Sequence, residues 1–127
     1  MFPRRRKSVR TKPQPDRVRE PSYLAWIRGC LCAIEGVYDS PWRTKHVCEG
    51  RIEAAHVRTG TDGAMGVKPS DCYSIPLCEK AHRLQHQIGE PAFEKMFDIS
   101  MRKTAGQYWQ AWLHNTTAGQ RYRGERQ

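Results

Sequence analysis

The sequence contains no apolar run long enough to cross a membrane. Its longest apolar runs, such as residues 23–27, cover only a handful of positions, whereas a transmembrane helix needs about 20. No apolar segment follows the arginines near the N-terminus, so these arginines do not begin a secretory signal. We therefore expect a cytoplasmic protein with no membrane partner.

Glycine motifs for nucleotide binding are also missing, and acidic residues are in the minority. Gly60, Gly63 and Gly66 match neither the G-x-G-x-x-G pattern nor the Walker A loop.

The 22 Lys and Arg residues outnumber the 13 Asp and Glu residues, which gives a formal net charge of +9. This balance favours binding to polyanions, and nucleic acid is the first partner to expect.

The five cysteines include no C-x-x-C pair, the spacing that would identify a zinc site most strongly. Their odd number and the missing export signal argue against a disulfide framework. Four thiolates could instead close a structural zinc site that joins a loop to a helix, the candidates being Cys30, Cys32, Cys48 and Cys78. The alternative is a set of reduced, buried cysteines without metal. Cys72 fits a small strand residue, although it could replace one of the four.

Length and composition predict one small domain between two basic tails. The chain has 127 residues, of which 38% are hydrophobic, so the core is small and benefits from a staple such as a metal ion. Residues 1–20 are predicted to be a disordered basic arm, either a solubilising tail or an arm that tracks phosphates. Residues 21–114 form the predicted domain, and residues 115–127 form a basic C-terminal tail that is also predicted to be disordered.

The pattern of apolar residues and breakers predicts an α+β fold. A short helix is expected to end at Gly29, and a strand over residues 51–57 should pair with a second strand that Pro76 ends. A helix should then run from Cys78 to Gly89, and a last helical region should follow Pro91.

Aromatic residues cluster at helical spacing near the end of this last region. Tyr108 and Trp112 are four residues apart, as are Trp109 and Leu113, so each pair lies on one face of a helix. The simplest interpretation is a core cluster. A platform for stacking nucleotides is the alternative.

Three histidines could carry chemistry. His82 and His86 are four residues apart on the predicted helix, so their imidazoles can bind one divalent ion. His56, on the preceding strand, could act as the general base for a water molecule. The alternatives are two solvated histidines on the helix and one hydrogen-bonded, buried histidine on the strand. With the positive charge, the three together favour metal-dependent phosphodiester hydrolysis.

Four stretches of the chain, in order, resemble the HNH endonuclease superfamily, whose fold is the ββα-metal finger. They are EAAHVRTG at residues 53–60, MGVKPSD at 65–71, PLCEKAHRLQH at 76–86 and GEPAF at 89–93. YLAWIR at residues 23–28 is similar to the opening helix of the small HNH-type proteins of phages and prophages, many of which have no known function. The resemblance covers residues 23–97.

The resemblance implies a metal-dependent endonuclease that acts on DNA, with a small ββα-metal, treble-clef-like core and flanking helices. His56 matches the histidine that activates water, and His82 and His86 match the ligands of one catalytic ion, which could be Mg, Mn, Ni or Zn. Asp71 is expected to be a further metal ligand or an orienting group. Cysteines before and at the start of the helix match a structural zinc site. The expected contacts to DNA phosphates, which could also be solvated charges, are Arg58, Lys68 and Arg83.

Three positions differ from the family's pattern. Ala55 stands where an acidic or histidine metal ligand often precedes the strand histidine, Tyr73 stands near the family's central asparagine, and Ala81 stands where a second zinc ligand is common. A catalytically degenerate DNA-binding protein that assists recombination or packaging is therefore the alternative, and a basic RNA-binding protein without a metal site is a third. The sequence leaves open whether two copies form a homodimer.

Overall fold

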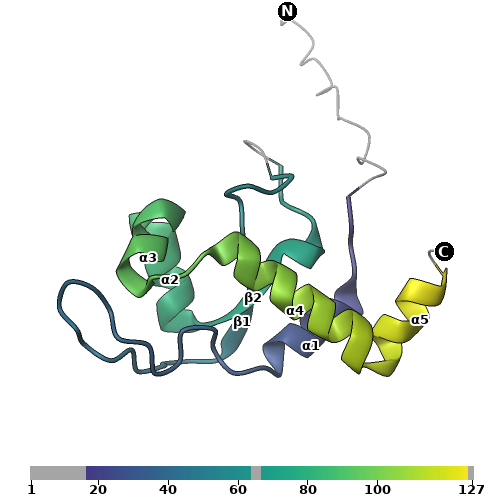
Figure 1. Ribbon diagram of the computed structural model, residues 1–127, viewed down its shortest axis with the longest axis horizontal. Helices are drawn as coiled ribbons and strands as arrows, with labels where there is room; N and C mark the ends of the chain where they lie inside the picture. The colour runs from purple at the N-terminus through teal and green to yellow at the C-terminus, as the bar shows by residue number, and fades with distance from the viewer. Residues whose placement is uncertain (1–16, 64–66, 126–127) are drawn as a thin grey trace, which may run out of the picture.

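The computed structural model describes residues 17–63 and 67–125 and has an α+β architecture, as the sequence predicts. The two strands form one sheet, and the helices lie around it, with α2 and α3 at one end of the molecule and α5 at the other (Figure 1). In chain order they are α1 (Pro21–Arg28), β1 (Ile52–His56), the 3-10 helix η1 (Asp71–Tyr73), β2 (Ser74–Cys78), α2 (Glu79–Ile88), α3 (Glu90–Phe97), α4 (Met101–Asn115) and α5 (Thr117–Glu125). No helix among the described residues is long and apolar enough to span a membrane.

The two strands pair antiparallel, with His56 opposite Ser74 and Ile52 opposite Cys78. Pro76 does not end β2, as the sequence suggested, because the strand continues to Cys78. The Pro76 carbonyl accepts a hydrogen bond from the Ala33 N–H at 2.7 Å, on the side of β2 that faces away from β1. The proline nitrogen points to the same side, so the missing N–H costs the pair no hydrogen bond.

The helix α2 follows β2 without a loop. Cys78 is its N-cap, and its Sγ accepts a hydrogen bond from the Ala81 N–H. The helix ends at Gly89, whose φ of 85° disfavours any residue with a side chain. The predicted helix over residues 78–89 is therefore confirmed to within one residue at each end.

The helical region predicted after Pro91 is two helices. The backbone of Asp98 turns left-handed, with φ of 52°, and closes α3. Ser100 then caps α4, its hydroxyl accepting a hydrogen bond from the Lys103 N–H. This break turns α4 back across the sheet (Figure 1).

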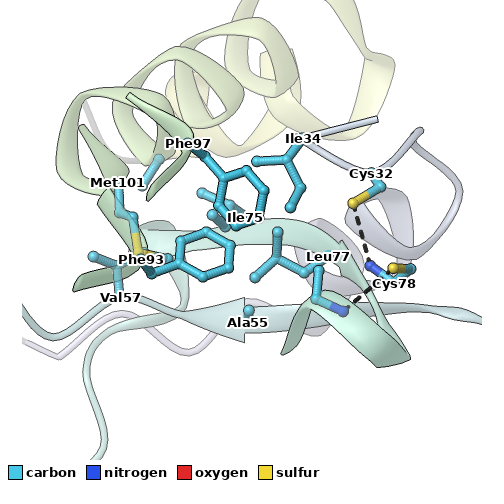
Figure 2. Packing of buried hydrophobic residues seen from close by; sticks show 12 residues of the cluster. Cys32, Ile34, Ala55, Val57, Ile75, Leu77, Cys78, Phe93, Phe97 and Met101 are labelled. Atoms are coloured by element: carbon cyan, nitrogen blue, oxygen red, sulfur yellow. Dashed lines mark hydrogen bonds between the residues drawn. The ribbon is translucent and has the colours of Figure 1, made fainter. Parts of the chain in front are cut away.

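The main core fills the space between the sheet, α3 and the start of α4 (Figure 2). Aliphatic side chains from both strands meet Phe93, Phe97 and Met101 there, all of them buried. The strands contribute Ala55, Ile75, Leu77 and Cys78 to this core, and Val57 directly after β1 adds to them. Apolar burial of this kind supplies most of the free energy of folding.

A second, smaller core joins α1 to α4, and it contains the predicted aromatic cluster. Tyr23, Ile27, Trp112 and Leu113 are buried in it, with Trp109 packed against them. The rings of Tyr23 and Trp109 meet edge to face, with centroids 4.9 Å apart. The structure thus confirms that the cluster is core.

The C-terminal tail predicted to be disordered is helical from Thr117 to Glu125. Gly119 lets this helix, α5, lie directly on α4, since an added Cβ there would come within 1.9 Å of the Trp112 carbonyl oxygen. The Tyr122 ring packs on Trp109 and Trp112. The sequence did not predict this helix, because its contacts with α4 form only when the chain turns back after the end of α4.

The basic arm predicted for residues 1–20 is ordered in its last four residues, while residues 1–16 lie outside the described part. Val18 N donates a hydrogen bond to Ser70 Oγ at 3.0 Å, and the Val18 carbonyl accepts one from Asp71 N at 2.8 Å. Arg19 donates hydrogen bonds to the carbonyls of Lys68 and Pro69. These backbone contacts, rather than apolar packing, order the segment.

Candidate functional site

His56 lies at the end of β1, and its ring is held by Asp71. The distance between His56 Nε2 and Asp71 Oδ1 is 2.9 Å. Asp71 is buried and also accepts a hydrogen bond from the Glu20 N–H at 2.7 Å through Oδ2. Because a carboxylate only accepts, the proton of a neutral His56 belongs on Nε2, which leaves Nδ1 as the basic nitrogen.

Of the two roles predicted for Asp71, the geometry fits the orienting group. Oδ1 contacts His56 and, at 3.7 Å, Arg19, while Oδ2 contacts Glu20. Both oxygens therefore have partners away from His82 and His86. A role as metal ligand has no support in this arrangement.

Burial lowers the pKa of His56, and the positive charge of Lys68 lowers it further, while the hydrogen bond to Asp71 opposes the shift. The net pKa lies below the ordinary histidine value. His56 is therefore neutral at pH 7, as a general base must be before it accepts a proton.

The two histidines of α2 face each other with their Nε2 atoms 3.1 Å apart. Two imidazoles on one ion, each at about 2.0–2.1 Å, have their nitrogens about 3.0–3.4 Å apart. Glu53 on β1 accepts a hydrogen bond from His82 Nδ1 at 2.8 Å, which places a proton on Nδ1 and makes Nε2 the nitrogen that could bind a metal. A carboxylate behind a metal-binding histidine is a common means of fixing its tautomer.

His56 and His86 line the same surface hollow, of about 280 Å³, between the end of β1 and the start of α3. Arg58 and Glu90 line it as well. The fold thus places the strand histidine and one histidine of the helical pair at the same hollow, while His82 lines the neighbouring one.

Glu90 holds the chain that leaves β1. Its carboxylate accepts hydrogen bonds from the N–H groups of Arg58 at 2.8 Å and Thr59 at 2.7 Å, and from the Gln85 side chain at 3.1 Å. These contacts tie the residues after His56 to α2 and α3.

The three predicted phosphate contacts are exposed around this hollow. Arg58 lines it and donates a hydrogen bond to the Val67 carbonyl at 3.2 Å, while Lys68 is near enough to lower the pKa of His56. Arg83 on α2 lines a neighbouring hollow with His82 and His86. All three charges therefore lie near one or more of the three histidines.

A second cluster of potential metal ligands lies apart from His56 and joins the loop after α1 to the start of α2. It is the one group of three or more such side chains among residues 17–63 and 67–125 whose ligand atoms all lie within 4.8 Å of one another. Its members are Cys32, His46, Cys48 and Cys78. Three thiols and one imidazole at these distances match a tetrahedral structural zinc site.

The individual distances also fit a bound metal. His46 Nε2 lies 3.5 Å from Cys78 Sγ, and ligand atoms on one tetrahedral zinc are about 3.5 Å apart for a nitrogen and a sulfur. Cys78 N donates a hydrogen bond to Cys32 Sγ at 3.4 Å (Figure 2). Burial and the neighbouring thiols raise the pKa of Cys48 to about 12. Without a cation, therefore, these thiols cannot all ionise together.

The sequence prediction of the zinc ligands was wrong at one position. Cys30 is outside the cluster, and its thiol donates a hydrogen bond to the Trp26 carbonyl at 3.5 Å. Cys30 follows α1 directly, so the helix end holds it away from the other thiols. His46 takes its place, two residues before Cys48, a spacing that could have indicated it.

The sequence analysis also missed Glu53 and gave Glu90 no role. Both are adjacent in space to predicted site residues, Glu53 to His82 and Glu90 to the backbone after His56. The alternation of β1 could have indicated Glu53, since it shares a face with Ala55, against which α2 packs. The contacts of Glu90 depend on the loop after β1, which no local pattern predicts.

Comparisons with models of known protein families, with curated proteins and with solved structures find no match for this chain.

Proposed function

We propose that this protein is a metal-dependent endonuclease of the HNH type, in which β1, β2 and α2 form a ββα-metal core. The observation that carries the proposal is the shared hollow, where His56 with a fixed tautomer lies beside His86 of the helical pair. A general base beside a metal-binding pair on a basic surface suits the hydrolysis of a phosphodiester.

In this mechanism His56 takes the proton from the attacking water. Asp71 holds the Nε2 proton and orients the ring, so Nδ1 receives the proton and the imidazolium is stabilised by the carboxylate. The water oxygen forms the new bond to phosphorus, and the bond to the leaving sugar oxygen on the opposite side breaks. The low pKa of His56 keeps it in the basic form before each turnover.

His82 and His86 would hold the divalent ion, with Glu53 fixing the orientation of His82. The ion supplies Lewis-acid stabilisation for the charge that develops on the phosphate and the leaving oxygen. Arg58 and Lys68 position the phosphate backbone on the His56 side, and Arg83 on the α2 side. Contacts of this kind carry no sequence information.

The cysteine and histidine cluster serves as a structural zinc site in this proposal. Its ligands come from the loop before β1 and from Cys78, which ends β2 and is the N-cap of α2. A zinc ion there would join this loop to the start of α2, which suits a small domain.

The decisive experiment follows the conversion of supercoiled plasmid to nicked and linear forms, with magnesium, manganese, nickel or zinc added. We expect metal-dependent cutting by the wild type, and a loss of about a hundredfold or more in His56→Ala, as for removal of a general base. His86→Ala should lose cutting as well, while both variants keep the zinc of the structural site.

His114→Ala is the matched control. The His114 side chain is exposed on α4, and its ring forms a hydrogen bond with the Gln110 side chain of the same helix, so this variant should cut DNA like the wild type. Equal cutting by wild type and His56→Ala would contradict the proposed role of His56.

A DNA-binding protein without nuclease activity is the second candidate. The observation that favours it is Ala55, which is buried in the core and provides no metal ligand beside His56. Intact DNA binding with no cutting by any of the four metals would select this alternative.

A further inference from the structure

The large hydrophobic side chains that stay exposed all come from one segment. In the described part of the chain they are Leu31, Tyr38, Trp42 and Val47, which are 72%, 63%, 77% and 65% exposed. Single exposed apolar residues are common, but several in one segment mark a surface that contacts something else. Three of the four belong to one turn of the chain between α1 and β1.

This turn is a short hairpin, residues 37–47, which we call the Trp42 hairpin. Tyr38 and Lys45 form an antiparallel bridge. The Asp39 N–H donates a hydrogen bond to the Thr44 carbonyl at 2.9 Å, and the His46 N–H donates one to the Val37 carbonyl at 2.8 Å. Trp42 lies at the tip, between Asp39 and Thr44. Figure 1 shows this segment as the loop that projects beyond α3 at the left.

The two faces of the Trp42 hairpin have different surroundings. Val37 packs against the main core and His46 belongs to the metal cluster, so this face is anchored. Side chains alternate along paired backbone, and the opposite face therefore presents Tyr38, Lys45 and Val47, all of them exposed.

The hairpin is tied to α3 and to the core by two further contacts, one of them near its tip. The Ser40 N–H donates a hydrogen bond to the Met96 carbonyl of α3 at 2.7 Å, and the His46 ring meets Phe97 edge to face at 6.0 Å. Trp42 is thus held away from the core by a fixed support, and a partner would not need to order this segment on binding.

The charges around Trp42 select the kind of partner. Arg43 and Lys45 are exposed, and Asp39 is the one acidic residue between positions 37 and 47. The Asp39 carboxylate already accepts a hydrogen bond from the Thr44 N–H at 3.0 Å. An exposed indole with two exposed cations in the same hairpin matches the surfaces that bind single-stranded nucleic acid, where bases stack on aromatic rings and cations contact phosphates.

We infer that the Trp42 hairpin binds unpaired bases of a nucleic acid, with Trp42 stacking on a base while Arg43 and Lys45 contact the adjoining phosphates. This inference rests on the proposed function, which it deepens by naming the substrate class: DNA that contains a single-stranded region. Bases inside an intact duplex have no free face for Trp42.

The hairpin lies within reach of a strand bound at His56. The helix α3 connects the two places, with Glu90 beside the His56 hollow and Met96 and Phe97 beside the hairpin. Seven residues of helix span about 10 Å at about 1.5 Å per residue, which corresponds to roughly three base steps.

The test measures binding by fluorescence anisotropy in the His56→Ala background, so that cleavage does not interfere. One labelled single strand and the duplex of the same sequence serve as probes. We expect Trp42→Ala to weaken binding of the single strand at least about tenfold and of the duplex less than about threefold, given the usual contribution of one stacked base. Trp42→Phe should keep most of the affinity.

Leu31→Ala is the control, since Leu31 is equally exposed but lies outside the hairpin; it should bind both probes like its parent. The inference is wrong if Trp42→Ala binds the single strand like its parent or loses the same factor on both probes. It is also wrong if the substitution instead dissociates a dimer in sedimentation. Because this readout needs no cleavage, its failure is distinguishable from a failure of the nuclease proposal in the plasmid assay.

Discussion

Burial and the charge of Lys68 both hold the pKa of His56 below its ordinary value. A general base with a lowered pKa stays active to lower pH, because it is protonated only below that pKa. We predict that Lys68→Met raises the pKa of His56 and moves the acidic limb of the pH profile of kcat/KM to higher pH. Nicking rates measured from pH 5 to 8, a range chosen around the ordinary histidine pKa of about 6.5, check this shift.

Lys103→Met removes the same charge from α4 and is the control for Lys68→Met. The acidic limb of the pH profile of kcat/KM for Lys103→Met should coincide with that of the wild type. A Lys68→Met enzyme with lower activity but an unmoved limb would show that Lys68 acts only on phosphate binding.

Glu53 acts through His82 rather than on substrate, so it is a positioning residue. The hydrogen bond of 2.8 Å to His82 Nδ1 fixes the tautomer that leaves Nε2 available. Glu53→Gln should weaken the catalytic metal about 10–100-fold, the usual effect of removing such a carboxylate, and more added metal should restore the rate. Titrations of nicking rate against manganese concentration measure this change.

Glu79→Gln provides the comparison for Glu53→Gln. Glu79 lines the same neighbouring hollow but pairs with Arg51 at 3.5 Å instead of a histidine. Its metal dependence should match that of the wild type, and an equal weakening in both variants would mean that overall charge, not the hydrogen bond, sets the affinity.

Among the segments of the chain, the loop between α1 and β1 is the one whose stability depends most on the metal cluster. It contributes Cys32, His46 and Cys48. We expect Cys48→Ser to lose the zinc and to lower the melting temperature by roughly 5 °C or more, since even 1 kcal/mol shifts a domain of this size by several degrees. Cys30→Ser should keep the zinc and the melting temperature of the wild type, because Cys30 is outside the cluster. Metal analysis and thermal unfolding give the two readouts.

The packing of α5 on α4 depends on a glycine. An added Cβ at Gly119 would overlap the Trp112 carbonyl, so Gly119→Ala should lower the free energy of unfolding by roughly 1–3 kcal/mol. Gly124 lies in the same helix with nothing within 4 Å of an added Cβ. Gly124→Ala should therefore leave stability unchanged or raise it slightly. Urea denaturation compares the two, and equal stabilities would contradict the close contact.

For the whole molecule, the net charge of +9 predicts DNA binding that weakens steeply with salt. Residues 1–16 carry six of the basic residues, at positions 4, 5, 6, 7, 10 and 12. Removing them should reduce the slope of log K against log salt by up to about 5. Arg17–Glu20 must be kept, since Arg19 and Glu20 contact Asp71. An unchanged slope would mean that residues 1–16 do not contact phosphates.

The fold was predicted well where the pattern is local. The two strands and α2 were predicted to within a residue or two, because alternation, caps and glycine stops are encoded by neighbouring residues. The tails were predicted less well, since order in Arg17–Glu20 and in α5 comes from contacts with distant segments.

Residue types and near neighbours along the chain account for the α+β class, for the spacing that puts His82 and His86 on one helix face, and for the positive charge. The packing of distant segments accounts for three further features: His46 rather than Cys30 completes the metal cluster, Asp71 orients His56, and Glu53 supports His82. Asp71 lies 15 positions from His56, and Glu53 lies 29 positions from His82. His46 is close to Cys48 in sequence but 32 positions from Cys78. Local spacing can suggest such partners, but only the packing of the segments brings their atoms together.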